Sequence, residues 1–462
     1  MRIAVLGAGY AGLTLARRLE RTLSADHEIV VVNDSPTHLV QHEIHRAIRR
    51  PAVAEDIVVP LTDVLDRAAI RVARVERVDP ESKRVHLTDL PSTGLSDGNR
   101  TARAYDGSDR TVSTGTERTG GESAGTAIEI ESENDGEAGT TGTDDGDADV
   151  VSNASNATTD DSDRGIGADG HESVLDYDLC AVCLGAETDF GDVPGVVEHA
   201  TPLKRLEDAE RIREEFLSML PEGGRVVVCG AGLSGVQAAG ELAALAREEG
   251  AEDGVEIVLT EALGRVAPAF PAEFSRAVRE ELEDRNVRVR TNAPVERATD
   301  DGVTIDGEEL SADQLLWTGG IRGPAALDGE RPIVKGTLQL DEGTFAVGDA
   351  ARAVDANGEA VPASAQSAVR AARAAAENIA TIAKHGDRGG FRPRLAPFEF
   401  DSPGWLVSVG DGAVAQVGPT VLRGRAARAL KTSVGAGYLT SVGAITNAVG
   451  LAREELPGRT DD

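Results

Sequence analysis

Two glycine-rich segments in the chain have the spacing of a loop that holds a diphosphate. Their glycines are Gly7, Gly9 and Gly12 in GAGYAG, and Gly230, Gly232 and Gly235 in GAGLSG. In such a loop the first glycine permits a tight turn, the second lets phosphates approach the backbone, and the third lets the next helix pack on the strand. Because that helix begins at the loop, its N-terminus faces the phosphates. Each segment therefore predicts a dinucleotide site.

Both loops lie between an apolar run and an amphipathic run, which is the context that the motif requires. The first follows RIAVL and opens GLTLARRLERTL, and the second follows RVVVC and opens GVQAAGELAALAREEG. Glycine-rich turns alone are common, so this context carries the prediction. Two loops suggest a resident and an exchanging dinucleotide, which suits hydride transfer between a flavin and a nicotinamide. The alternative is a duplicated domain in which one loop is purely structural.

The residue that ends the strand after each loop is the usual contact of the ribose hydroxyls. After the first loop this place falls on Asn33, with Asp34 as the alternative, so an amide takes the place of the usual carboxylate. After the second loop it falls on Glu261. A carboxylate repels a 2′-phosphate, which favours NADH over NADPH, although Arg265 nearby leaves NADPH open.

The elements around the loops alternate between strand and helix. A helical EDAERIREEFLSML precedes the strand RVVVC, and the helix after the second loop leads into the strand VEIVLTE. This order predicts an α/β fold with parallel sheets.

Composition narrows the class of protein. The chain has 462 residues, enough for two or three domains, and a net charge of −32 with very few lysines, which resembles salt-adapted archaeal proteins. So many carboxylates repel nucleic acid. Three cysteines in strand-like runs do not indicate a disulfide framework, so we expect a reducing cytoplasm. The sequence predicts no signal peptide and no membrane-spanning helix, since about 18 consecutive apolar residues would be needed.

Residues 95–172 interrupt this pattern with a stretch rich in Gly, Ser, Thr and Asp. Such a stretch has too few apolar residues to offset its ordering entropy, which predicts an acidic, disordered insertion. The apolar patterns before and after it, RVARVERVDPESKRVHLTDL and VLDYDLCAVCLG, resemble paired strands. We therefore expect a long insertion in a hairpin.

Several motifs together resemble one family. The stretches are LGAGYAG, THLVQHEIH, DYDLCAVCLGAETDFGDVPGV, CGAGLSGVQAAGEL, LLWTGGIRGP, FAVGDAA and PASAQSAVRAA. In order and spacing they resemble flavoproteins with two dinucleotide-binding domains, most closely type II NADH:quinone oxidoreductases. The resemblance implies FAD and NADH as cofactors and a membrane quinone as acceptor.

The same resemblance assigns roles to further residues. It places Gly348 and Asp349 on the ribityl chain of FAD, and Gly185 and Gly319 in the cofactor-binding loops. Ala365 and Gln366 resemble the segment against the isoalloxazine ring near the quinone. Gln237 stands where the family usually has a glutamate, so it is a candidate to alter affinity or rate in the nicotinamide pocket. We count Gln366 and Gln237 as the candidate catalytic residues.

Cysteine and histidine motifs have simpler interpretations. Cys180 and Cys183 form a CxxC inside a strand pattern rather than at a helix start, so core packing is favoured over a redox pair. The family positions of the cysteines of disulfide reductases and sulfide:quinone oxidoreductases are also vacant here. His38, His42 and His45 invite a metal site, but no acid or cysteine completes a ligand set, and we expect no metal.

The C-terminal region contains a basic cluster in an otherwise acidic chain. Its members are Arg423, Arg425, Arg428 and Lys431. Apolar residues recur among and after them at helical intervals, which predicts a basic amphipathic helix able to lie on an anionic membrane. The alternative is a helix that forms a dimer or docks on the core, and the family resemblance favours the membrane.

These patterns predict two Rossmann-like domains and a C-terminal membrane-docking region. An FAD-binding domain comprises residues 1–94, 173–205 and 325–400, the insertion 95–172, an NADH-binding domain 206–324, and the C-terminal region 401–462. The expected activity is non-proton-pumping NADH:quinone oxidoreduction at the inner face of the cell membrane, with a homodimer as one option for the assembly. The alternatives are a soluble NAD(P)H reductase or oxidase with another acceptor, and a redox-sensing flavoprotein without significant turnover.

Overall fold

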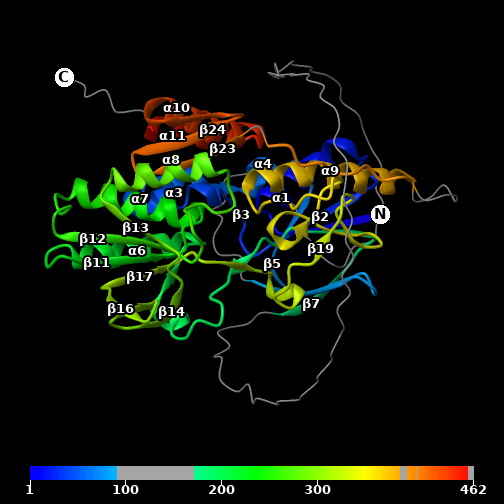
Figure 1. The fold of residues 1–462 in the computed structure, drawn as a ribbon. Helices are drawn as coiled ribbons and strands as arrows, with labels where there is room; N and C mark the ends of the chain where they lie inside the picture. The colour runs from blue at the N-terminus through cyan, green and yellow to red at the C-terminus, as the bar shows by residue number, and fades with distance from the viewer. Residues whose placement is uncertain (91–170, 386–392, 403, 456–462) are drawn as a thin grey trace, which may run out of the picture. The chain divides into compact units, whose positions relative to one another are not determined.

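The computed structural model describes residues 1–90, 171–385, 393–402 and 404–455 (Figure 1). The predicted insertion lies outside the described residues, apart from its last two residues. Its expected disorder therefore stays a prediction. Among the described residues, no helix is both long and apolar enough to cross a membrane.

The first sheet has eight strands in the order β20-β21-β8-β1-β2-β5-β6-β7. In chain order they are β1 (Arg2–Leu6), β2 (Glu28–Asn33), β5 (Ala69–Asp79), β6 (Arg84–Asp89), β7 (Glu172–Asp176), β8 (Leu179–Val182), β20 (Gln339–Asp341) and β21 (Thr344–Ala346). The strands from β21 to β5 pair in parallel. Helices α1 (Tyr10–Thr22) and α9 (Ala365–His385) pack against each other. Residues Ile3 to Leu6 are fully buried, as expected for a central parallel strand covered on both faces.

Strands β6 and β7 pair in antiparallel fashion on either side of the insertion, which confirms the predicted hairpin. The chain then turns at Tyr177 and Asp178 and enters β8, which pairs in parallel with β1. One continuous apolar pattern therefore forms two strands, β7 in the antiparallel part of the sheet and β8 in its parallel part.

Between β2 and β5 the chain forms short elements that carry the histidines. They are β3 (Thr37–Leu39), the 3-10 turn η1 (Gln41–Glu43), α2 (His45–Arg49), α3 (Val53–Ile57), β4 (Val58–Pro60) and α4 (Leu61–Val64). Strands β3 and β4 form an antiparallel pair.

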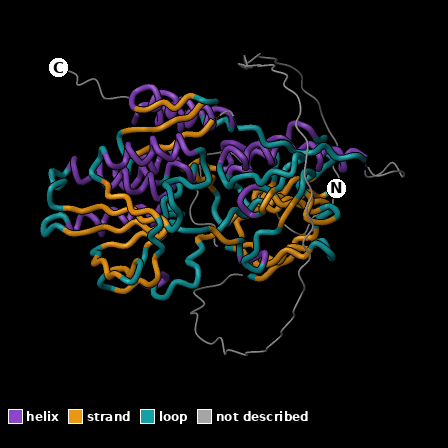
Figure 2. Tube along the Cα trace, in the orientation of Figure 1, coloured by secondary structure: helices purple, strands orange, loops and turns teal. Residues whose placement is uncertain are grey.

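The second sheet is the five-stranded sheet β10-β17-β11-β12-β13, parallel throughout. Its strands are β10 (Thr201–Pro202), β11 (Gly224–Cys229), β12 (Val255–Glu261), β13 (Val287–Thr291) and β17 (Gln314–Trp317). The helices α6 (Leu206–Met219), α7 (Leu233–Glu248) and α8 (Ala272–Glu283) pack against strands of this sheet (Figure 2). The predicted α/β order and parallel pairing are confirmed.

Smaller elements complete these two sheets. Near the second sheet are α5 (Val196–His199) and the antiparallel strands β14 (Val295–Thr299), β15 (Gly302–Ile305) and β16 (Glu308–Ser311). Where the chain passes between the sheets are β9 (Glu187–Thr188), β18 (Ile321–Arg322), η2 (Ala325–Leu327) and β19 (Ile333–Val334). After β21 follow η3 (Gly348–Ala350) and β22 (Arg352–Ala353), and β22 pairs with β19.

The C-terminal region forms an antiparallel sheet of three strands and two helices. They are β23 (Gly404–Val409), β24 (Gly412–Val417), β25 (Thr420–Arg423), α10 (Gly424–Ser441) and α11 (Ile445–Glu455). Helix α10 packs on β24, β23 packs on α7, and α11 packs on α3. The C-terminal region thus contacts α3, which lies in the chain between two strands of the first sheet, and α7, which lies between two strands of the second.

Candidate functional site

The first glycine loop connects β1 to α1, and its backbone leaves no room for side chains at two of its glycines. Gly7 has φ +90°, and its N–H donates to the carbonyl oxygen of Val32 at 2.7 Å. A Cβ on Gly12 would lie 1.8 Å from the carbonyl oxygen of Gly7. A Cβ on Gly9, by contrast, would meet no atom within 4 Å. The first and third glycines close the turn, and the second borders open space.

The second loop, between β11 and α7, repeats this geometry. Gly230 has φ +102°, and its N–H donates to the carbonyl oxygen of Thr260 at 2.8 Å. A Cβ on Gly235 would lie 1.9 Å from the carbonyl oxygen of Gly230, whereas a Cβ on Gly232 would meet nothing within 4 Å. Two sites that share no strand thus have the same pattern of closed and open positions.

Both helices that follow the loops begin without a side-chain cap. Gly9 is the N-cap of α1 and Gly232 that of α7, and neither first turn contains an acidic residue. The first N–H groups of a helix have no partner within it, and together with the helix dipole they attract an anion. A diphosphate fits both places.

The residues predicted to contact ribose are engaged with their own loops. The Asn33 side-chain oxygen accepts from the Ala8 N–H at 2.8 Å, and its amide nitrogen donates to the carbonyl oxygens of Ser35 and Thr37 at 2.8 and 3.2 Å. The amide of Asn33 therefore braces the first loop.

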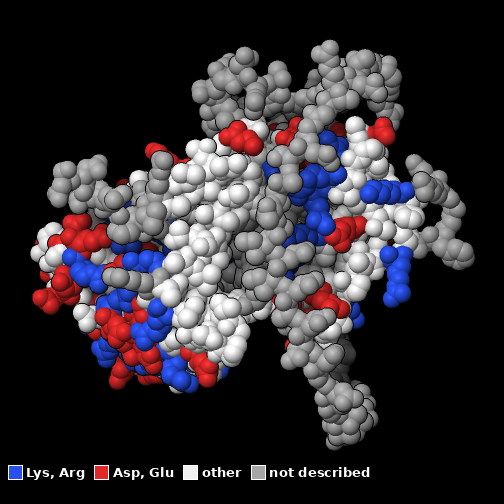
Figure 3. Space-filling model, turned by 90° about the horizontal axis from the view of Figure 1, so that it is seen from above, with Lys and Arg blue, Asp and Glu red and all other residues white. Residues whose placement is uncertain are grey.

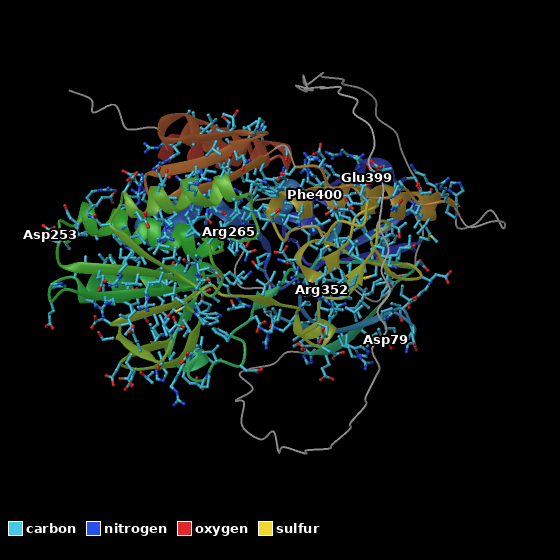
Figure 4. The ribbon with its side chains drawn as sticks, viewed as in Figure 1. Asp79, Asp253, Arg265, Arg352, Glu399 and Phe400 are labelled. Carbon is cyan, nitrogen blue, oxygen red and sulfur yellow. The ribbon has the colours of Figure 1, made fainter. Side chains whose placement is uncertain are left out.

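Glu261 braces the second loop in the corresponding way. Its carboxylate accepts from the N–H groups of Ala231 and Leu263, both at 2.9 Å. An ionised carboxylate offers about four acceptor sites, so it retains capacity for a ribose hydroxyl. Arg265 lies just beyond β12 (Figure 4) and donates to the carbonyl oxygen of Pro268 at 2.7 Å.

A cavity of about 840 Å³ adjoins the first loop. Seven of the predicted cofactor-binding residues line it: Gly7, Gly9, Asn33, Asp34, Gly185, Gly348 and Asp349. They come from the ends of β1, β2, β8 and β21, which are neighbours in the sheet, so the carboxyl ends of parallel strands meet here as the α/β fold requires. Of the segment that begins at Ala365, it is Ala368 that reaches the cavity.

Two cations, Lys204 and Arg331, influence Asp349, which lines this cavity. Burial raises the pKa of the Asp349 carboxyl, and the opposing influence of Lys204 and Arg331 is smaller. Burial likewise lowers the pKa of Lys204, which lines the same cavity. Lys204 was not among the predicted residues. A lysine just before a helical run rich in acidic residues is usually a charged surface residue. No signal in the sequence therefore identifies Lys204 as part of the site.

The two candidate catalytic glutamines lie elsewhere. Gln366 accepts a hydrogen bond from the Ser402 hydroxyl at 3.3 Å, beside the start of β23. Gln237 on α7 donates to the Ser408 hydroxyl of β23 at 3.2 Å. Both therefore contact the C-terminal region. Gly319 lies against the second loop, since a Cβ on Gly230 would be 2.7 Å from the Gly319 Cα.

The three cysteines are buried and unpaired. Cys183 lies under the first loop, where a Cβ on Gly12 would be 3.3 Å from the Cys183 Cβ. Burial raises the pKa of the Cys183 and Cys229 thiols to about 12. These thiols are protonated at neutral pH and pack as small apolar groups.

The histidines make separate hydrogen bonds, and the described residues contain no cluster of three or more groups suited to a metal. His38 is buried, its Nδ1 at 2.8 Å from the Ala8 carbonyl oxygen and its Nε2 at 3.0 Å from the Tyr438 hydroxyl. His45 Nε2 lies 2.7 Å from the Ser408 hydroxyl. Burial lowers the pKa of His38 to about 4, so it is neutral at pH 7.

Two members of the basic cluster at the C-terminus form internal ion pairs. Arg423 pairs with Glu280, Glu281 and Asp284 around α8 at 2.7 to 2.9 Å. Lys431 lies 3.6 Å from the carboxylate of Glu43. Arg423 and Lys431 thus hold α10 and the strand before it against the rest of the chain. This arrangement agrees with the alternative interpretation, in which the helix docks on the core.

The fold and the loops define an oxidoreductase with one binding domain for each of two dinucleotides. The family model described as pyridine nucleotide-disulphide oxidoreductase matches residues 1–372, and the chain belongs to this family. Membership implies FAD and a nicotinamide dinucleotide. The residues fit both, because each loop has an uncapped helix start and an open second glycine.

Individual relatives are more distant. The chain is 28% identical over 277 residues to a type II NADH:quinone oxidoreductase of Haemophilus influenzae, a match spanning 51% of this chain and 61% of that protein. It is 22% identical over 389 residues to a protein of the same name from Staphylococcus aureus, covering 78% and 76% of the two chains. The solved NDH2 of Plasmodium falciparum in complex with NADH has the same fold, with a TM-score of 0.70, 14% identity and coverage of 98% and 97%.

Proposed function

We propose that this protein is an NADH dehydrogenase that passes electrons from NADH through FAD to a membrane quinone. The observation that carries the proposal is the repetition of one diphosphate-binding geometry, in the loops of Gly7 and Gly230. Only the first loop opens on the 840 Å³ cavity, which has room for a large resident cofactor. The names of the relatives, type II NADH:quinone oxidoreductase, support the choice of donor and acceptor.

In this proposal the residues of the first loop hold FAD. The N–H groups at the start of α1 contact the diphosphate, and Asp349 accepts from the ribityl hydroxyls. Burial raises the pKa of the Asp349 carboxyl, and Lys204 and Arg331 oppose that effect. Bound flavin takes a hydride and returns two electrons, so no side chain needs to act as a nucleophile.

The second loop would hold NADH. Its helix start contacts the diphosphate, and Glu261 accepts from the ribose hydroxyls with the acceptor capacity that its two backbone donors leave. A 2′-phosphate at that place meets the carboxylate, which favours NADH over NADPH. Gln237 and Gln366 remain proposed contacts on the nicotinamide and quinone sides, and both are held by serines of the C-terminal region.

The C-terminal helices would form the membrane-docking surface. Val434, Ile445 and Val449 are 51%, 64% and 45% exposed. Seen from above, the area over the C-terminal elements is largely free of charged side chains, although the chain carries a net charge of −32 (Figure 3). A partly apolar face with few charged side chains lets an acidic protein approach a bilayer without strong repulsion. This face supports the proposal of an enzyme bound peripherally to the inner face of the cell membrane.

The cycle is tested by absorbance of the purified protein at high salt. We expect a visible flavin band that bleaches with NADH and returns when a short-chain ubiquinone is added. A flavin that reoxidises only with other acceptors would indicate a soluble reductase or oxidase. Absence of turnover with every acceptor would indicate a redox sensor.

Membrane docking is tested separately by cosedimentation with phosphatidylglycerol and phosphatidylcholine vesicles. Val434→Asp combined with Ile445→Asp should reduce binding at least tenfold. The matched control is Val197→Asp, at a residue that is 63% exposed on α5. Equal binding by both variants would remove the C-terminal helices from the docking surface.

A further inference from the structure

A tyrosine in the first glycine loop is linked to a histidine and a buried glutamate. Tyr10 lines the 840 Å³ cavity. Its hydroxyl is hydrogen-bonded to Nδ1 of His42, and it also accepts from the His42 backbone N–H at 3.3 Å. Nε2 of His42 lies 3.3 Å from a carboxylate oxygen of Glu43. The three side chains form an unbroken chain from the cavity into the protein.

Glu43 is the fixed end of this chain. It is 1% exposed, and Arg46 at 3.3 Å and Lys431 at 3.6 Å face its second oxygen. Burial by itself raises the pKa of a carboxyl, but Lys431 and His42 outweigh it and hold the pKa of Glu43 well below its usual range. Glu43 is therefore ionised and keeps a proton on the Nε2 nitrogen of His42, so Nδ1 is the nitrogen that exchanges a proton with Tyr10.

His42 reaches solvent, whereas its partners do so less. Its side chain is 32% exposed, against 2% for Glu43. Tyr10 and His42 face each other. The other titratable groups beside them are His38, Glu43, His45 and Tyr438. His38 is neutral and engaged at both ring nitrogens, so His42 is the member placed to take a proton from water.

Resting on the proposed function, we infer that His42, Tyr10 and Glu43 form a proton relay that supplies the acceptor side of the cofactor cavity. NADH, one proton and a quinone give NAD⁺ and a quinol, so one proton must enter from solvent in each cycle. Tyr10 gives its hydroxyl proton to the reduced acceptor and receives one from Nδ1 of the doubly protonated His42 ring. His42 is left neutral, with its remaining proton on Nε2, and takes up a proton from water at Nδ1. Glu43 is the positioning residue.

The test compares two acceptors with different proton demand. Ferricyanide takes one electron and no proton, whereas quinone takes two electrons and two protons. For His42→Gln we expect the rate with a short-chain ubiquinone to fall about a hundredfold, the scale of a general acid. Flavin content, bleaching by NADH and the ferricyanide rate should stay within about threefold of wild type. His199→Gln, at an exposed histidine, is the matched control.

Two further variants separate a relay from a structural role. Tyr10→Phe removes only the hydroxyl and should produce the same selective loss. His42→Ala should regain at least tenfold of its quinone rate on addition of imidazole, which reaches the partly exposed site, and no rescue is expected in Tyr10→Phe. Parallel loss of both acceptor rates, or an unchanged quinone rate in His42→Gln, would overturn the relay. A wild type that reduces ferricyanide but no quinone would overturn the proposed function and leave the relay without an acceptor.

Discussion

Gly9 offers a perturbation that separates cofactor binding from folding. A Cβ at Gly9 meets no protein atom within 4 Å, and the residue has φ −70°. For Gly9→Ala, loss of a glycine N-cap and reduced freedom of the unfolded chain act in opposite directions. Each amounts to less than about 1 kcal/mol, so the free energy of unfolding of the apoprotein should change by less than that.

The same methyl group occupies the space where a diphosphate would contact the backbone. Displacing one charge-assisted hydrogen bond costs about 1.5 to 3 kcal/mol, which corresponds to a 10- to 150-fold weaker affinity for FAD. Gly12→Ala should behave differently. Its Cβ would lie 1.8 Å from the Gly7 carbonyl oxygen, so the loop or α1 must shift, at about 3 kcal/mol of stability.

The assay is titration of apoprotein with FAD, followed by quenching of flavin fluorescence, together with denaturant unfolding of the same apoprotein. Gly437→Ala in the middle of α10, where a Cβ also meets nothing within 4 Å, is the control and should keep FAD affinity. A Gly9→Ala variant that binds FAD within threefold of wild type would refute the assignment of the first loop.

Three further predictions concern the second loop and the buried polar groups. Gly232→Ala should weaken NADH binding by a similar 10- to 150-fold while FAD stays bound, measured by titrating flavin bleaching; loss of FAD instead would contradict the separation of the two sites. Asn33→Asp should put a carboxylate against the Ser35 and Thr37 carbonyl oxygens and raise its folded pKa above the unfolded value of about 3.9, so stability is lost as pH rises through that range. Denaturant unfolding at pH 4 and pH 8 checks this, and an equal loss of stability at both pH values would contradict the expected rise of the pKa of the new carboxyl. His38 has a folded pKa of about 4, below an unfolded value of about 6.5, so stability falls as pH drops between them. From pH 7 to pH 5 the wild type should lose about 2 kcal/mol more than His38→Asn, and parallel curves would show that His38 is not the group responsible.

Much of the fold follows from local pattern. The apolar runs RIAVL and RVVVC form central strands because a strand with apolar side chains on both faces is stable only where both faces are buried. Each glycine spacing then fixes the turn, because the first glycine needs positive φ and the third needs the absence of a Cβ. These requirements are satisfied within about ten residues, so the sequence alone predicts both loops.

The partners of the polar residues were harder to predict. Asn33 and Glu261 stand at the expected ends of their strands, but their first hydrogen bonds go to the N–H groups of Ala8 and Ala231. The motif predicts the position and not the competition between ribose and backbone. From the sequence, Arg423 is interpreted as part of a cluster of cations that faces the membrane. In the structure it pairs instead with three carboxylates around α8. Sequence periodicity gives the face of a helix but not the charge of the surface packed against it.

The histidines show the same limit most clearly. His38, His42 and His45 recur at near-helical spacing, yet they lie on β3, η1 and α2, and each ring meets a different partner. The spacing suggests one shared ligand, whereas the break from strand to turn to helix gives each ring its own hydrogen-bond partner. What gives His42 its chemistry is Tyr10, 32 residues earlier in the chain, which the tight turn at Gly7 brings beside η1. The glycine loop therefore does more than leave room for a diphosphate, because it also fixes where the tyrosine hydroxyl meets an imidazole.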